Sequence, residues 1–280
     1  MCGKEDRGII PYTDLSRRRF SALAAAAAGF TVTGCATAAP GGVAERDVTV
    51  TTMDGSAEAV LFHPEGVGSW PGVLFWPDIG GLRPAMRDMG RRLAGSGYTV
   101  LVVNPFYRSA TAAQVQALDR DGRMALRGTF TPVGVTRDAD AFVTYLDGLP
   151  QTSNAKVGVQ GYCMGGPLAF RTADTRPDRV GAVGSFHGGG LVVAGPDSPH
   201  LLVGRSNARY LVAIAKNDDE KEPEAKTTLR ETFASTGRSA VVEVYNGNHG
   251  WCVPDNAAYN PAEAERAWAA LLELYRTALV

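Results

Sequence analysis

Gly161-Tyr162-Cys163-Met164-Gly165-Gly166 lies between a short β-branched run, Lys156–Gln160, and the helical pattern of Pro167–Ala173. A strand, a G-x-C-x-G turn and a helix in this order form the layout of a nucleophile elbow, with cysteine where serine is commoner. The flanking glycines permit a turn too sharp for side chains, so the sulfur projects from the end of the sheet. The N-terminus of the next helix points free N–H groups at that sulfur and favours the thiolate. The alternative is a small buried cysteine in a glycine-rich turn, because free cysteine is commonly buried.

The composition is that of an ordinary globular protein. The chain has 280 residues, of which 45% are hydrophobic and 20% charged, and a formal net charge of −1. This length suits one large domain or two small ones. No charge imbalance points to nucleic acid as a partner, and no stretch is long enough to span a bilayer. We expect a monomer whose partner is a small molecule.

An export signal is predicted at the N-terminus. Ser16–Phe20 contains adjacent arginines and precedes a weakly apolar run, Ala22–Val32, as in twin-arginine signals. Val32-Thr33-Gly34-Cys35 resembles a lipobox, in which a lipid on Cys35 would tether the protein to a membrane. The alternative is cleavage after the small residues Ala36–Ala39. Both alternatives predict a periplasmic or cell-envelope protein.

Three regions follow from this interpretation: a signal over residues 1–39, a flexible tether over 40–46 and one folded domain over 47–280. Processing would leave Cys163 and Cys252 as the cysteines of the folded domain. A disulfide or a metal site that uses them is a minor alternative.

Strands and helices alternate along the predicted domain. Asp54-Gly55 is a turn between two alternating segments, which predicts an opening antiparallel hairpin over 47–62. Five later runs besides the one before Cys163 predict strands, and most are apolar throughout: Gly72–Trp76, Tyr98–Val103, Val180–Phe186, Tyr210–Ala215 and Ala240–Tyr245. Helices are predicted over Pro84–Ser96, Arg137–Leu149, Glu222–Ser235 and from Pro261 onward, with a loop and a short helix over Phe106–Thr131. This pattern indicates a three-layer α/β fold with a mostly parallel sheet covered on both faces.

Polar residues follow the predicted ends of five strands. They are Asp78, Cys163, His187, Asp218 and His249. Ligands of such sheets bind at the carboxyl ends of the strands, so we expect these residues to gather at one edge.

A cysteine nucleophile needs a base and a residue that orients the base. His249 follows the last predicted strand and comes after Asp218, and the order nucleophile, acid, histidine is that of α/β-hydrolases. We therefore predict Cys163 as nucleophile, His249 as general base and acid, and Asp218 as the residue that orients it. Asp219 remains an alternative to Asp218.

Further candidates for the site lie in the loop after Trp76 and directly after Cys163. The backbone N–H groups of Ile79 and Met164 are the predicted oxyanion donors, from their positions in the chain. Asp78 would disfavour the thiolate or hold the thiol proton, or it caps its own loop. His187 is expected to line the pocket, whereas His63 and His200 are expected to be structural or exposed.

An ordered set of motifs resembles the dienelactone hydrolase family over residues 47 to 280. The motifs are Trp76–Gly81, Asn104–Tyr107, Gly161–Gly166, Phe186–Gly189, Asn217-Asp218 and Asn248–Trp251. The resemblance implies one α/β-hydrolase domain and a triad at Cys163, His249 and Asp218. It also implies carboxymethylenebutenolidase activity, in which an enol-lactone opens to a keto acid, and it implies no metal or organic cofactor.

The chain departs from the founding members of that family at two positions. They carry glutamate where this chain has Asp78, and arginine where this chain has Val253. Arg108 could supply the missing carboxylate clamp, or it is a solvated loop arginine. The rival functions are a broad small-ester or thioester hydrolase, a lipid-anchored binding protein, and a redox or metal-binding thiol protein.

Overall fold

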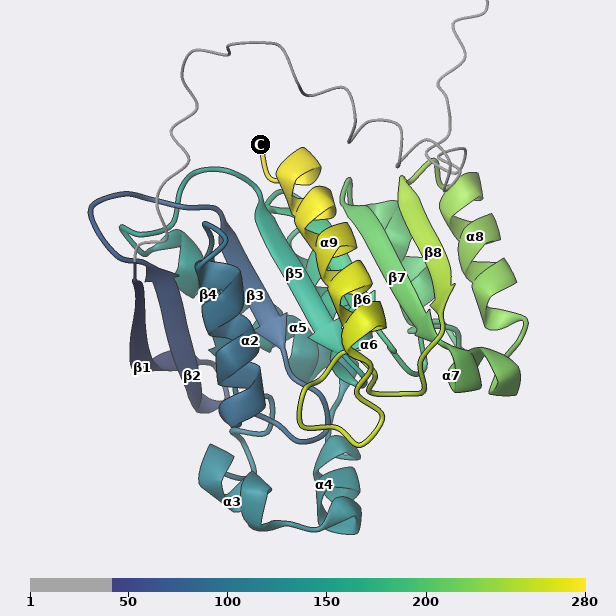
Figure 1. The fold of residues 1–280 in the computed structure, drawn as a ribbon, viewed down its shortest axis with the longest axis horizontal. Coiled ribbons are helices and arrows are strands. Elements are labelled where there is room, and N and C mark those ends of the chain that lie inside the picture. Colours follow the sequence, from purple (N-terminus) through teal and green to yellow (C-terminus); the bar gives the residue numbers. More distant parts are fainter. Residues whose placement is uncertain (1–41) are drawn as a thin grey trace, which may run out of the picture. The chain divides into compact units, whose positions relative to one another are not determined.

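Eight strands form one sheet within residues 42–280, the part of the chain that this computed structural model describes (Figure 1). The order in the sheet is β1-β2-β4-β3-β5-β6-β7-β8. β1 and β2 are antiparallel to their neighbours, and β4, β3, β5, β6, β7 and β8 are parallel. The strands are β1 Val43–Thr52, β2 Gly55–Pro64, β3 Gly72–Trp76, β4 Thr99–Val103, β5 Val157–Tyr162, β6 Val180–Phe186, β7 Arg209–Ala215 and β8 Ala240–Tyr245.

Helices cover both faces of this sheet (Figure 1). α2 (Pro84–Ala94) and α9 (Pro261–Ala278) pack on one face, and α5 (Pro132–Asp147), α6 (Gly165–Thr175) and α8 (Ala225–Ser235) pack on the other. Successive residues of β3 supply both cores, since Leu74 packs with the α5 and α6 side while Val73 and Phe75 pack with the α2 and α9 side. The predicted three-layer α/β fold is therefore confirmed. Successive side chains of a strand point to opposite faces of the sheet, so a fully apolar strand needs helices on both faces to bury it.

The remaining helices are short connections. They are α3 (Ala112–Ala117), α4 (Arg120–Arg127), a 3₁₀ helix at Pro199–Arg205, and α7 (Lys216–Lys221). Thr111 and Asp119 cap α3 and α4 by accepting backbone N–H bonds. Two helices therefore occupy the segment for which one was predicted. Each is stabilised by its N-cap residue, and each is too short to show a periodicity in the sequence.

Two predicted boundaries were wrong. Val43–Arg46 belongs to β1 and pairs with the end of β2, so the tether predicted over 40–46 extends at most to Gly42 and the domain begins before residue 47. β1 is an edge strand, and its first four residues are two half-buried and then two exposed ones, so buried and exposed side chains do not alternate there. The helix predicted from Arg137 begins at Pro132, where the Thr131 side chain accepts the N–H of Gly134. Proline at the first helical position is compatible with a helix start.

The predicted export signal over 1–39, including Cys35, lies outside the described residues. None of the helices within residues 42–280 has the length and apolar character that a membrane span requires.

Candidate active site

The backbone around Cys163 has the sharp turn that the glycine pattern predicts. Cys163 adopts a left-handed conformation with φ +54° between the end of β5 and the start of α6. A Cβ on Gly161 would lie 1.9 Å from the carbonyl oxygen of Gly165, and one on Gly165 would lie 2.5 Å from that of Trp76. Backbone atoms cannot move aside as a flexible side chain can. Glycine is therefore required at both positions for Cys163 to reach this place.

We expect Gly161→Ala to destabilise the fold by about 3 kcal/mol or more, because the added methyl group overlaps backbone that forms the elbow. Gly189→Ala is the matched control, since a Cβ there meets nothing within 4 Å. Urea unfolding of both variants measures the difference. Equal stability of the two would contradict this account of the elbow.

Cys163 packs against an apolar cluster built around Phe106 and Met164, and Ile79 and Phe130 pack against the same cluster. The backbone N–H groups of Ile79 and Met164 have no hydrogen-bond partner among residues 42–280. Both amides therefore remain available to a substrate oxygen near the sulfur. This supports their predicted role as oxyanion donors.

His249 lies between Cys163 and Asp218. Its Nδ1 is 2.5 Å from Oδ2 of Asp218, and its backbone N–H donates to Oδ1 of Asn217 at 2.7 Å. Burial alone would lower the pKa of His249, but hydrogen bonds with Asp218 and Cys163 raise it to about 10. The imidazole thus favours its protonated form at neutral pH, in contact with both predicted triad partners.

Asp219 faces away from this site. Both of its carboxylate oxygens accept hydrogen bonds from Nζ of Lys226, at 2.8 and 2.7 Å. The two neighbouring aspartates lie on α7, where consecutive side chains point in different directions. The geometry therefore favours Asp218 over Asp219 as the residue that orients His249.

His187 is part of the support beneath the site. It has φ +41° and a fully buried ring, and its Nδ1 accepts the backbone N–H of Cys163 at 3.1 Å. Its ring packs edge-on against His249 and Trp251. Burial, with the nearby His249, keeps the pKa of His187 well below its ordinary value. His187 is therefore neutral and contacts both the elbow and the histidine, rather than lying at an open pocket surface.

Asp78 is buried and forms a network that the sequence analysis missed. Its carboxylate accepts two hydrogen bonds from Arg83, at 2.6 and 3.0 Å, and one from the backbone N–H of Gly80. Arg83 also donates to both oxygens of Asp255, at 2.7 and 2.8 Å. Asp78 thus has a cationic partner, and its predicted effect on the thiol stays a prediction.

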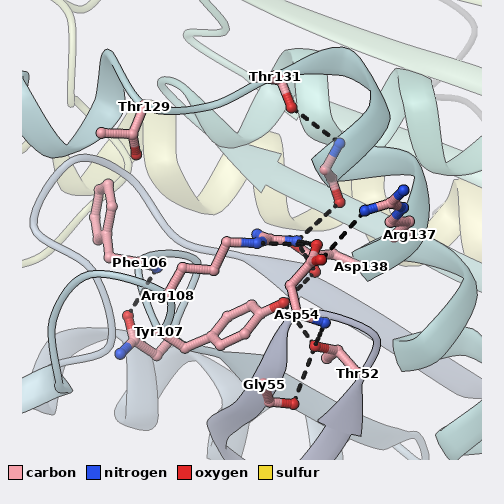
Figure 2. Close-up of polar contacts among 12 residues, drawn as sticks. Thr52, Asp54, Gly55, Phe106, Tyr107, Arg108, Thr129, Thr131, Arg137 and Asp138 are labelled. Carbon is pink, nitrogen blue, oxygen red and sulfur yellow. Dashed lines mark hydrogen bonds and ion pairs between the residues drawn. The ribbon is translucent and has the colours of Figure 1, made fainter.

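Arg108 lies in an exposed turn, as the alternative prediction has it, but its guanidinium is paired with carboxylates of the protein (Figure 2). It donates to both oxygens of Asp138 at 2.7 Å and to Oδ2 of Asp54 at 2.7 and 3.2 Å. Asp138 is 3% exposed and also accepts a hydrogen bond from Tyr107. Asp138 lies on the same face of α5 as the buried Val135 and Phe142. A carboxylate on an apolar helix face indicates a buried ion pair, and this pattern in the sequence could have predicted the partner of Arg108.

The remaining thiol and histidines lie outside this arrangement. Cys163 and Cys252 are both free, and burial raises the pKa of Cys252 well above its ordinary value. His63 stacks on Trp70, and Nδ1 of His200 is bonded to Ser198. Within the described part of the chain, no group of three or more His, Cys, Asp or Glu residues is arranged to hold a metal ion.

The chain is similar to known proteins in both sequence and fold. Residues 57–279 match the model of the dienelactone hydrolase family. A Synechocystis sp. protein assigned as a carboxymethylenebutenolidase is 25% identical over 83% of this chain and 96% of its own. Carboxymethylenebutenolidase 1 of Cupriavidus pinatubonensis is 25% identical over 81% of this chain and 94% of its own. The crystal structure of a Klebsiella pneumoniae protein assigned as a dienelactone hydrolase has a TM-score of 0.76 and 19% identity, and covers 84% of this chain and 99% of its own.

Proposed function

The chain belongs to the dienelactone hydrolase family, a family of hydrolases, and we propose that it opens a lactone or an ester through a thioester on Cys163. The observation that carries this proposal is the contact of His249 with two partners. Hydrogen bonds with both Asp218 and Cys163 raise the pKa of His249 to about 10, although its burial opposes this. A base that contacts a nucleophile on one side and an orienting carboxylate on the other constitutes the machinery of acyl transfer.

In the first half of the proposed reaction, His249 holds the proton of the Cys163 thiol as an imidazolium, and the sulfur attacks the carbonyl carbon of the substrate as the thiolate. The negative charge that develops on the carbonyl oxygen is stabilised by the N–H groups of Ile79 and Met164. The carbon–oxygen bond then breaks, and the leaving oxygen takes a proton from Nε2 of His249. The product of this step is an alcohol or enol and a thioester on Cys163, and in a lactone the two remain joined.

In the second half, His249 takes a proton from a water molecule, and the resulting hydroxide attacks the thioester carbon. The carbon–sulfur bond breaks, which releases the acid and restores the sulfur. Asp218 stabilises the imidazolium that is present before the first half and forms again in the second half, and it fixes the tautomer of His249 through Nδ1. His187 holds the backbone of Cys163 during both steps.

The thioester is the testable intermediate. We expect an acid quench during turnover of 4-nitrophenyl acetate to trap one acetyl group per chain, mapped by mass spectrometry to Cys163 and removed by neutral hydroxylamine. Cys252 is the control within the same molecule, because it is a free but buried thiol. Acetylation of Cys252 to the same extent, or turnover without any acylated Cys163, would contradict the proposal.

Two substrate classes fit this chemistry. The names of the relatives favour dienelactone-type substrates, as does the resemblance of the motifs. A broad small-ester hydrolase is the second candidate, and the ion pairs of Arg83 and Arg108 favour it because neither guanidinium is left unpaired for a substrate carboxylate. Export to the periplasm or cell envelope remains a prediction from the N-terminal sequence.

A further inference from the structure

A cavity of about 280 Å³ lies beside the nucleophile, between the end of β3, the loop around Phe106 and the start of α5. Cys163 and His249 do not line it. Phe106 and Phe130 line it and also belong to the apolar cluster that packs against Cys163. Leu168, on the helix that follows Cys163, completes this side. The cavity is thus the neighbouring space into which the part of a substrate remote from its reacting carbonyl would extend.

The lining of the cavity also contains charged side chains, whose polar contacts are drawn in Figure 2. Arg108 donates to Asp138, to Asp54 and to the backbone carbonyl of Gly134, so its three nitrogens all have acceptors in the protein. Arg137 also lines the cavity and donates to Oδ1 of Asp54 at 3.2 Å. Each guanidinium therefore already faces at least one carboxylate.

The charges of this wall sum to zero, because two arginines, Arg108 and Arg137, face two aspartates, Asp54 and Asp138. A substrate carboxylate that approached Arg108 would meet Asp54 and Asp138 at short range. It would have to displace one of them or accept repulsion from both. An uncharged group has no such penalty.

The second arginine near the site is neutralised in the same manner. Arg83 lies between Asp78 and Asp255 and has bidentate contacts to both. Asp78 precedes Ile79, whose N–H is a proposed oxyanion donor. Arg83 and Arg108 are therefore both matched by carboxylates of the protein itself.

We propose that the cavity binds the uncharged remainder of the substrate, so that this enzyme selects neutral esters or lactones over those that carry a carboxylate. Apolar contacts come from Phe106, Phe130 and Leu168, and Asp54 repels an anionic substituent. This inference rests on the proposed hydrolysis through Cys163 and adds the class of substrate to it.

The first test compares two substrates that differ in one charge: the 4-nitrophenyl half-ester of adipic acid and the same compound methylated on its free carboxyl group. Release of 4-nitrophenol is measured for the full chain, with the uncatalysed rate subtracted. We expect kcat/KM to be about tenfold or more higher for the methylated compound. Equal or higher kcat/KM for the anionic half-ester would overturn the inference and leave the proposed hydrolysis standing.

The second test changes the charge of the cavity wall. Asp54→Asn should shrink the preference for the neutral compound about tenfold, because Arg108 and Arg137 lose a shared partner. Arg137→Gln should enlarge the preference for the neutral compound. The fold should tolerate this change, because the Arg137 side chain is 44% exposed. Asp88→Asn is the matched control, because it removes an exposed carboxylate of α2 on the other face of the sheet.

The outcomes separate the two proposals. A preference that stays unchanged in both Asp54→Asn and Arg137→Gln, or that shifts as much in Asp88→Asn, overturns the role of the cavity. Hydrolysis of neither compound, or hydrolysis that persists in Cys163→Ala, overturns the proposed function and the inference with it.

Discussion

Cys163→Ala is expected to lower kcat for ester or lactone hydrolysis by about four to six orders of magnitude, which is the scale of nucleophile removal in hydrolases with such triads. The sulfur is the atom that would form the covalent bond, and Cys252, the other thiol within residues 42–280, is buried and cannot replace it. The remaining residues would still bind substrate and stabilise an oxyanion, so a small residual rate above water is consistent. Initial rates with the neutral adipate diester measure the effect.

The fold should survive this substitution. Alanine and cysteine both have a Cβ, so Cys163→Ala keeps the cost of the left-handed backbone at φ +54°. Cys163→Gly removes that cost and should be about 1 kcal/mol more stable than Cys163→Ala, yet equally inactive. Urea unfolding of the two variants distinguishes lost chemistry from lost structure. Substantial hydrolysis by a folded Cys163→Ala variant would refute the mechanism.

The second large effect is expected at Asp218. Asp218→Asn should reduce kcat by about 10²- to 10⁴-fold, because an amide can donate to Nδ1 and select the tautomer of His249 that cannot act as base toward Cys163. Asp219→Asn is the matched control with the same change of charge in the adjacent residue, and its partner is Lys226. It should stay within about twofold of the native rate, since it contacts no residue of the proposed triad. A larger loss in Asp219→Asn than in Asp218→Asn would reverse the assignment.

The titration of His249 gives an independent readout of the same pair. Its pKa is about 10, and the hydrogen bond with Asp218 is a main cause of the increase from 6.5. Asp218→Asn should therefore lower the pKa of His249, whereas Asp219→Asn should leave it unchanged, as observed by NMR of the imidazole. Because the folded-state pKa is raised, the stabilisation from this imidazolium is fully present below about pH 6.5 and is lost as the pH rises through about 10.

Much of the fold could be predicted because its signals are local. Fully apolar strands such as Gly72–Trp76, and glycines around Cys163, constrain the backbone over a few residues wherever they occur. The start of β1, Val43–Arg46, has two half-buried residues followed by two exposed ones and so carries no such pattern, and the prediction failed there. The short helix α7, which contains Asp218, was also missed, because six residues are too few to show a period.

The sequence by itself determined the elbow, the parallel sheet and the strand ends at which Cys163 and His249 lie, because backbone sterics and the period of apolar residues act within short segments. Only the tertiary structure decided the pairings of side chains. Arg83 contacts Asp255 from 172 residues away, and Arg108, in a turn, contacts Asp138 on α5 from 30 residues away. Such contacts depend on how helices are rotated against the sheet, which no short segment specifies. The charge around the proposed site is therefore a property of the assembled fold.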